Sequence, residues 1–349
     1  MSTTSASVGS RLLCVVLVTA CRASSIAQDP QMAQQEWVPL LLNPASAGSN
    51  DRQAVLVHRK QWKPYVDPFR TMTGSFDLCV TPTSRTKKRS AGRIGVGAVF
   101  LNDRAGAPEF RTTSADLHLA YHVKVAEAST IGAGFYFGAR QQATGPNNGS
   151  WAAQYDGMHY DPSLPTGERF GAAPRTVADM GAGVLYNYNG GPGSRKAAHS
   201  PKAQAGMAIY HAARPRLSSD PESTDRLPRR ISLFAQAEMP VGGRGFAVEP
   251  RCFAQVQGGF SMVQAGAAFR IALPEKKGFM MPEHRPAMSI GGYYRTTGVL
   301  VSNVVFSWGE YAVSLAYDMN MVASKRPVNG KGAAEIGLRY VLPAASGRP

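Results

Sequence analysis

The residues best suited to metal or acid–base chemistry are two histidines, His118 and His122, which lie four positions apart in a run of alternating polar and apolar residues. On a β-strand, residues with this spacing share a face and lie about 13 Å apart along the strand. That distance is too long for one metal ion to bind both imidazoles. We therefore expect hydrogen bonds from these histidines to Asp116 or another neighbour, and we predict no metal site.

The chain has none of the short motifs of common enzyme classes: no G-x-S-x-G nucleophile turn, no Walker A loop and no H-E-x-x-H pair. Gly132-x-Gly134 and Gly181-x-Gly183 lie within alternating runs with no helix after them, which argues against nucleotide binding. We predict a non-enzymatic protein without catalytic residues and without a cofactor. A Ser–His–Asp group assembled from separate strands is the enzymatic alternative.

The connection at 144–175 mixes aromatic residues with carboxylates. This composition suits a glycan, a cation or a protein surface, although a loop that packs on itself explains it better. The residues concerned are Trp151, Tyr155, Asp156, His159, Tyr160, Asp161 and Glu168.

The chain is basic, with 38 Lys and Arg against 23 Asp and Glu and a formal net charge of +15. Two basic runs, 85–89 and 325–326, lie in connections. Nucleic-acid binding would need aromatic residues interleaved with the charges and a suitable fold, so we predict no nucleic-acid partner. Anionic lipid headgroups, lipopolysaccharide or an acidic protein suit these runs better, and simply solvated turns explain them best.

Residues 1–27 have the pattern of an export signal. Arg11 precedes a short apolar core at 12–20, far shorter than the ~20 residues of a membrane-spanning helix. Ser25-Ile26-Ala27 fits a signal peptidase site, whereas residues 18–21 resemble a lipobox that would leave a lipidated Cys21. We favour cleavage after Ala27. The mature chain then keeps two cysteines, for which we predict free thiols, buried or facing the wall: Cys79 and Cys252.

The mature chain is dominated by alternation with a period of two residues, which indicates β-strands. In 130–142, for example, Ile, Ala and Phe occupy odd positions, and Gly, Tyr and Arg occupy even positions. Bacterial single-chain barrels of the outer membrane have an even number of such strands. The pattern predicts about fourteen, with cores at 53–62, 71–80, 92–102, 112–125, 130–142, 176–189, 202–212, 229–241, 246–257, 261–273, 286–295, 298–308, 310–320 and 333–342.

The two faces of these runs favour a membrane barrel over a soluble sandwich. One face is apolar and aromatic, and the other carries Gly with isolated charges, as expected for a lipid-facing wall around a crowded lumen. Aromatic residues at strand ends, such as Trp308 and Tyr340, fit an interfacial girdle. If both chain ends are periplasmic, the long connections fall outside, although those at 81–91 and 190–201 are longer than periplasmic turns usually are. The predicted fold is an all-β, antiparallel transmembrane barrel of about 14 strands.

The start of the mature chain resembles a known family. It reads Asp29-Pro30-Gln31 and then Pro-Leu-Leu-Leu-Asn-Pro-Ala-Ser-Ala-Gly at 39–48. This is similar to DPQFSQYMFNPLLINPAYAG, the mature start of the PorP/SprF family of Bacteroidota outer-membrane proteins. The R-x-Q-W of that family matches 59–62, and its closing strands match 315–318 and 334–336. The departures are Met32 for an aromatic residue, Gln-Glu-Trp at 35–37 for Tyr-Met-Phe, and Ser46 for Tyr.

The resemblance implies a non-enzymatic outer-membrane component of type IX secretion and gliding in a Gram-negative, Bacteroidota-type bacterium. Such proteins anchor periplasmic machinery, or assist delivery or attachment of a surface adhesin. The implied partners are periplasmic or outer-membrane secretion-system proteins, a secreted cell-surface adhesin and outer-membrane lipid. A porin-like passive channel is the alternative, although the Gly-lined strands favour a plugged lumen.

We divide the chain into a signal peptide (1–27), a periplasmic N-terminal segment (28–50) and the barrel (51–349). The segment could plug the barrel, lie along its rim or dock a periplasmic partner, and a plain lead-in to the first strand explains it about as well as partner binding. For Arg59 and Trp62, a lumen ion pair and an interfacial anchor are the stronger explanations. The residues for which we predict partner binding are Pro39, Asn43, Pro44, Ala45, Gly48, Arg59 and Trp62.

Overall fold

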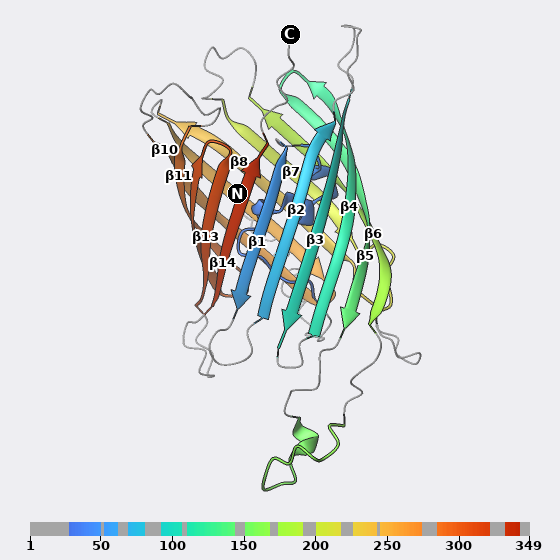
Figure 1. Cartoon of the computed structure of the whole chain (residues 1–349). Helices are drawn as coiled ribbons and strands as arrows, with labels where there is room; N and C mark the ends of the chain where they lie inside the picture. The colour runs from blue at the N-terminus through green and yellow to red at the C-terminus, as the bar shows by residue number, and fades with distance from the viewer. Residues whose placement is uncertain are drawn as a thin grey trace, which may run out of the picture.

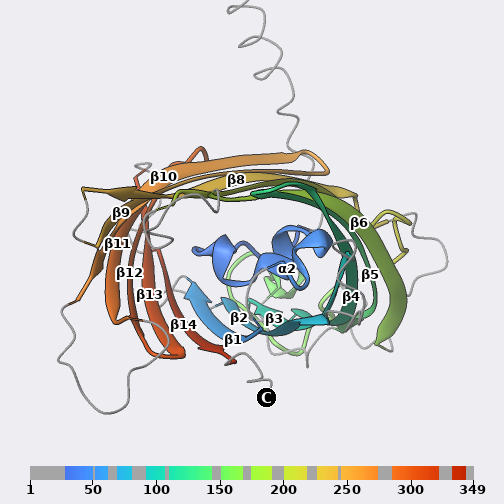
Figure 2. The same cartoon turned by 90° about the horizontal axis from the view of Figure 1, so that it is seen from above.

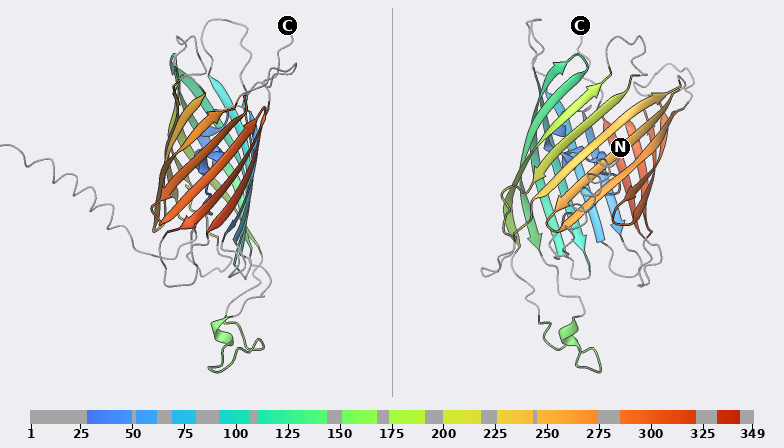
Figure 3. Two further views of the ribbon diagram at one scale, coloured as in Figure 1. Left: turned by 90° about the vertical axis from the view of Figure 1, so that its left-hand side faces the viewer. Right: turned by 180° about the vertical axis from the view of Figure 1, so that it is seen from behind.

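Fourteen antiparallel strands form a closed barrel in which β1 pairs with β14 (Figures 1 and 3). The strands of this computed structural model are β1 (Gln53–Gln61), β2 (Phe69–Val80), β3 (Arg93–Ala105), β4 (Phe110–Ala126), β5 (Ser129–Ala143), β6 (Arg175–Asn189), β7 (Lys202–Tyr210), β8 (Arg230–Val241), β9 (Phe246–Gln257), β10 (Phe260–Ala272), β11 (Ala287–Arg295), β12 (Val299–Trp308), β13 (Tyr311–Asn320) and β14 (Ala333–Val341). The structure describes residues 28–49, 52–61, 69–80, 92–106, 110–143, 151–167, 174–190, 200–217, 226–242, 245–273, 285–321 and 332–342.

The predicted strands and their faces are confirmed. Each predicted core matches one observed strand, with ends that differ by at most three residues. In β5 the apolar odd positions are exposed, whereas Gly132, Tyr136 and Arg140 on the even positions are buried. The outer wall therefore carries the apolar residues and the lumen carries the glycines and charges, as in a membrane barrel.

Two ends of the barrel are distinguished by the connections. The start of β1 and the end of β14 lie at one end, which we call the terminal end; the opposite end, from which the 151–167 segment extends, is the loop end (Figure 1). In bacterial outer-membrane barrels the longer loops are extracellular and the turns at the other end are periplasmic. By this rule we expect the loop end to face the cell exterior and the terminal end to face the periplasm.

Aromatic side chains form a row of contacting rings on β12–β14 at the terminal end. The ring centroids of Trp308 and Tyr311 lie 6.0 Å apart, and those of Tyr311 and Tyr340 lie 5.0 Å apart. Amphipathic rings at this level match the interfacial girdle of a membrane barrel. Among the described residues, no helix has the length and apolarity needed to cross a bilayer.

Residues 28–49, which we call the plug segment, lie inside the barrel (Figure 2). The segment contains three short helical turns, η1 (Gln35–Trp37), α2 (Pro39–Leu42) and η2 (Pro44–Ser46). Pro39 and Pro44 each occupy the first position of a turn, where the missing N–H of proline costs nothing. The sequence left three placements open for this segment: inside the barrel, along its rim or docked on a periplasmic partner. In the structure the segment lies inside the barrel.

Candidate functional site

The plug segment begins at the loop end with a buried ionic cluster around Asp29. Its carboxylate lies 2.7 Å from Nε2 of His211, 2.8 Å from Nη2 of Arg140 and 3.0 Å from Nη1 of Arg230. Its backbone N–H donates to Oε1 of Gln257 at 3.0 Å. Strands β5, β8 and β9, together with the residue that follows β7, therefore hold the first residues of the segment.

His211 joins Asp29 to the wall. Its Nδ1 lies 2.6 Å from Asp179, and that carboxylate also accepts a hydrogen bond from the Tyr136 hydroxyl. Burial by itself would lower the pKa of His211, but the two carboxylates outweigh burial and raise it. Burial by itself would raise the pKa of Asp29, but His211, Arg140 and Arg230 hold it well below its ordinary value. Both shifts favour the charged forms, a cationic imidazolium beside an anionic carboxylate.

A second cluster holds the segment at the seam where β1 meets β14. Glu335 accepts hydrogen bonds from the backbone N–H groups of Ala33 (2.7 Å) and Gln34 (3.0 Å). Arg59, its register partner, lies 3.5 Å from Glu335 and 2.7 Å from Asp318. All three charged side chains are buried. Arg59 thus forms the lumen ion pair that its position on a strand end suggested.

Polar side chains of β11–β13 complete this part of the lumen. The Gln34 side chain donates to Oγ of Ser314 at 3.0 Å and accepts from Nδ2 of Asn303 at 3.1 Å. Arg295 donates to the backbone carbonyl of Met32 at 3.1 Å. Buried backbone groups need such partners, and the wall supplies them where the segment has no regular structure.

The middle of the segment packs against two arginines. Glu36 forms an ion pair with Arg251, which also donates to the Tyr293 hydroxyl at 2.8 Å. The guanidinium of Arg339 lies 4.3 Å from the ring centroid of Trp37, close enough for a cation–π interaction. Both contacts use residues at which the chain departs from the family pattern, so the departures are accommodated by the wall.

The carbonyls at the end of α2 accept hydrogen bonds from β7 and β8. The donors are the Tyr210 hydroxyl to Leu40 (2.6 Å), Nη2 of Arg230 to Leu41 (3.0 Å) and the Ser232 hydroxyl to Leu42 (2.8 Å). The last carbonyls of a helix have no partner within it. The wall therefore supplies a hydrogen-bond donor to the backbone carbonyl of each leucine in this turn.

Asn43 joins the turn to the wall through its side-chain amide nitrogen, while its side-chain oxygen bonds within the segment. Its Oδ1 accepts from the backbone N–H of Ala45 at 2.9 Å, and its Nδ2 donates to the carbonyls of Val184 (2.8 Å) and Met207 (3.3 Å). The side chain reaches these carbonyls only because Gly206 faces it: a Cβ there would lie 2.6 Å from Nδ2.

Glycines of the wall receive the last residues of the segment. A Cβ on Gly134 would lie 2.7 Å from the backbone of Ala45, and one on Gly95 would overlap the carbonyl oxygen of Ala47. That carbonyl lies 2.7 Å from Nε2 of His122. Gly48 follows with a φ of 62°, a left-handed conformation that favours glycine. The Gly-rich inner face is therefore complementary in shape to the plug segment.

The residues predicted to bind a partner are brought together inside the lumen, with one exception. Asn43, Pro44, Ala45, Gly48 and Arg59 are buried. Pro39 is half-buried, and Trp62 lies outside the described residues. In this structure Asn43, Ala45 and Arg59 are engaged inside the barrel, and partner binding stays a prediction. Sequence reasoning missed Asp29 and its partners, although isolated charges on a Gly-rich strand face signal such a lumen network.

The two histidines of β4 differ in their contacts. His122 hydrogen-bonds to the plug segment, as given above, whereas His118 stacks on Tyr136 with ring centroids 5.4 Å apart. Neither ring nitrogen of His118 has a hydrogen-bond partner among the described residues. For His118 the predicted bond to Asp116 or another neighbour is therefore wrong, because aromatic stacking occupies the ring instead. No group of three or more His, Cys, Asp or Glu in the described ranges is arranged to hold a metal ion.

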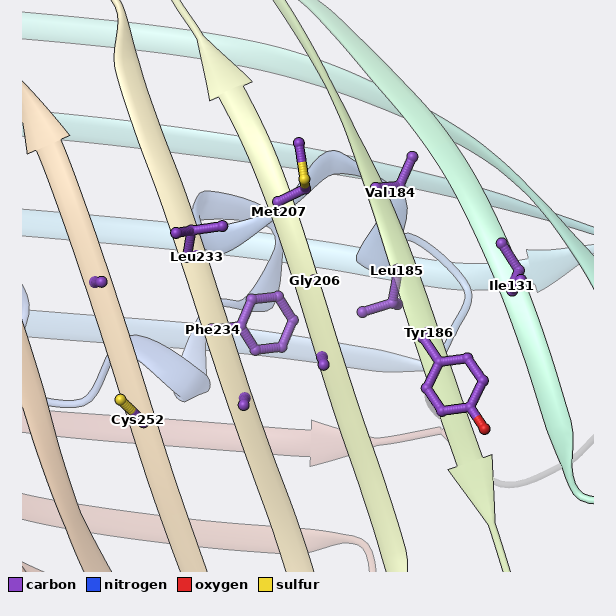
Figure 4. Close-up of a pocket in the computed structure, with 12 residues that line it drawn as sticks. Ile131, Val184, Leu185, Tyr186, Gly206, Met207, Leu233, Phe234 and Cys252 are labelled. Carbon is purple, nitrogen blue, oxygen red and sulfur yellow. The ribbon is translucent and has the colours of Figure 1, made fainter. Parts of the chain in front are cut away.

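The outer wall has an apolar hollow of about 590 Å³ over β5–β9 (Figure 4). Its lining combines large side chains, including Met207 and Leu233, with small residues such as Ala205 and Cys252. Cys252 is exposed on this wall, Cys79 is half-buried, and both thiols are free, as predicted. The apolar lining suits contact with lipid acyl chains.

The family described as "Type IX secretion system membrane protein PorP/SprF" matches residues 24–340. The chain belongs to the PorP/SprF family. It is thus a type IX secretion system protein of the outer membrane, as the resemblance implied. No curated protein is similar enough in sequence to count as a relative.

Solved barrels similar to this PorP/SprF protein share little sequence with it. BamA from Haemophilus ducreyi lacking POTRA domains 1–3 is 8% identical over 83% of this chain and 71% of its own, with a TM-score of 0.41. The TodX monoaromatic hydrocarbon channel is 9% identical over 87% and 92%, with a TM-score of 0.40. The translocator domain of the autotransporter NalP from Neisseria meningitidis is 10% identical over 89% and 96%, with a TM-score of 0.32.

Proposed function

We propose that this barrel is a closed, non-enzymatic scaffold that attaches a secreted adhesin to the cell surface through its loop end. The observation that carries the proposal is the 151–167 segment, which extends away from the barrel (Figure 1) and exposes apolar side chains. Tyr155, Met158 and Tyr160 are 56%, 79% and 46% exposed. An exposed apolar surface on an ordered loop fits a protein partner.

The segment holds its own shape. Tyr155 and Tyr160 form a β-bridge, and the Asp156 carboxylate accepts hydrogen bonds from the backbone N–H groups of Met158 (2.8 Å) and His159 (2.7 Å). The side chain of Gln154 donates to the carbonyl of Leu164 at 3.1 Å. Such a preformed loop loses little conformational entropy on binding.

The plug segment supports a scaffold rather than the porin-like channel. It fills the lumen through ion pairs and hydrogen bonds to strands around the barrel, among them Asp29 to Arg140 and Glu335 to Ala33. A passive channel would need an open water-filled path. A stable, large conductance of the purified protein in planar bilayers would contradict a closed barrel.

Anchoring of periplasmic machinery is the second candidate. It is favoured by three connections at the terminal end, β2–β3 (81–92), β6–β7 (190–201) and β10–β11 (273–286), because periplasmic turns of bacterial barrels are usually short. Pull-down of periplasmic secretion proteins by the wild-type barrel, and its loss when these connections are shortened, would support anchoring.

The test of adhesin attachment is a triple variant, Tyr155→Ser, Met158→Ser and Tyr160→Ser, in the full chain. The matched control is Asp161→Asn together with Ser163→Ala, which changes the same loop outside its apolar tip. We expect the triple variant to release into the medium a secreted protein that the wild type and the control retain on the surface. Equal retention in all three strains, with the barrel intact by heat-modifiable migration, would reject the loop as the attachment site.

A further inference from the structure

Three cationic side chains lie in a row on the outer wall at the loop end. Lys60 of β1 is the register partner of Arg70 of β2, and Arg70 is the register partner of Arg104 of β3. All three side chains are exposed. Direct register partners of an antiparallel pair have Cβ atoms about 4.5–5.5 Å apart, and like charges so placed repel each other. Arg111 of β4 extends the row, since it is the register partner of Arg104.

No described carboxylate forms an ion pair with Lys60, Arg70 or Arg104. Asp103, next to Arg104 on β3, has the opposite orientation and accepts a hydrogen bond from the buried Thr71. The row thus concentrates positive charge on a lipid-facing wall, at the loop end. Such a concentration of like charge attracts anions.

A hollow of about 570 Å³ lies beside the row, over β1 and β11–β14. The register places its lining in two levels. Lys60, Ala334, Tyr317 and Ser302 form the level nearer the loop end, and His58, Ile336, Leu315, Val304 and Ile290 form the next level toward the middle of the wall. The hollow is therefore mainly polar toward the loop end and mainly apolar toward the middle of the wall, an order that matches a lipid headgroup followed by its acyl chain.

We propose that Lys60, Arg70 and Arg104 bind the phosphate of a phosphorylated lipid of the outer leaflet, with an acyl chain of that lipid in the adjacent hollow. Guanidinium groups bind phosphate oxygens in a bidentate manner, and an ammonium adds a point charge. The charge row and the hollow meet at Lys60, which belongs to both. The phosphate of the lipid would offset the positive charges and so reduce the repulsion between the register partners.

The test uses native mass spectrometry of the full-length barrel in detergent, with bis-phosphorylated lipid A as the probe. The first arm needs no variant: we expect wild-type protein to bind lipid A at least tenfold more tightly than the same lipid after hydrolytic removal of both phosphates. Inorganic phosphate at millimolar concentration should not displace lipid A. Equal binding of the dephosphorylated lipid, or displacement by phosphate alone, would overturn the proposal.

The second arm uses the triple variant Lys60→Gln, Arg70→Gln and Arg104→Gln. Its control is Arg52→Gln, which removes one exposed cation just before β1, at the terminal end. We expect at least a tenfold loss of lipid A affinity in the triple variant, and a smaller loss in Leu315→Trp, which fills the hollow. Wild-type affinity in the folded triple variant would overturn the assignment, and so would an equal loss in the control.

Discussion

Nε2 of His211 lies 2.7 Å from the carboxylate of Asp29, although the two residues are 182 positions apart in the chain. This contact ties the start of the plug segment to the wall of the barrel. Arg140 and Arg230 contact the same carboxylate. Asp29 therefore supplies negative charge to three cationic groups that are buried together.

Replacement of Asp29 by Asn should release the start of the plug segment. Removal of one partner from a buried ion pair costs about 3–5 kcal/mol, because it leaves uncompensated charge. We expect a lower melting temperature and new protease cleavage within residues 28–40. Asp161→Asn, in the exposed loop, is the matched control. An unchanged melting temperature and cleavage pattern in Asp29→Asn would show that the segment does not depend on this contact.

The plug segment should be held less firmly in the lumen both at low pH and at high pH. The contribution of Asp29 is present above the ordinary carboxyl pKa of 3.8 and is lost as pH falls through its lowered pKa. The contribution of His211 is present below the ordinary imidazole pKa of 6.5 and is lost as pH rises through its raised pKa. Protease protection should therefore be greatest between about pH 3.8 and 6.5 and should weaken on the alkaline side. His211→Gln should remove the alkaline decrease, and a decrease that persists in this variant would assign it to another group.

Gly95→Ala should displace the end of the plug segment, because the new Cβ would overlap the carbonyl oxygen of Ala47. Overpacking of this kind costs typically about 1–3 kcal/mol. Urea unfolding of the barrel in detergent measures the loss. Gly292→Ala is the control, since a Cβ at Gly292 meets no atom within 4 Å. Equal stability of the two variants would mean that the segment does not pack closely at Gly95.

An epitope tag placed between Ala27 and Gln28 should be accessible from outside the cell. Gln28 is exposed, and the adjacent Asp29 contacts Arg230 at the loop-end start of β8. A tag after Leu342, at the terminal end, serves as the control and should react with antibody only after permeabilisation. Antibody labelling of intact cells measures both. A tag before Gln28 that needs permeabilisation would reverse the orientation of the barrel or of the segment.

The strands could be predicted from the sequence because each carries its own signal. In β5, alternation of Phe with Gly indicates both the strand and the face that meets lipid. The fourteen strands need only local pattern and even pairing to form the barrel, and no single residue decides the result. The resemblance at residues 29–48 then supplied the family, which periodicity cannot supply.

The lumen site could be predicted only in part. Arg59 was expected to form a lumen ion pair, but its partners depend on the register between β1 and β14, which brings residues 59 and 335 together. Asp29 and His211 meet only when the segment enters the barrel, and no local pattern encodes such a contact. For His118, the strand face could be predicted from the local pattern. Its stacking on Tyr136 could not, because that contact depends on the register with the neighbouring strand.

The seam between β1 and β14 has a consequence for assembly. Glu335 pairs with Arg59 across the seam and also accepts hydrogen bonds from Ala33 and Gln34 of the plug segment. The first and last strands of the barrel therefore share one carboxylate with the segment enclosed in the lumen. We therefore expect closure of the barrel to be coupled to binding of the plug segment, so that a chain with a misplaced plug segment would also pair β1 and β14 less stably.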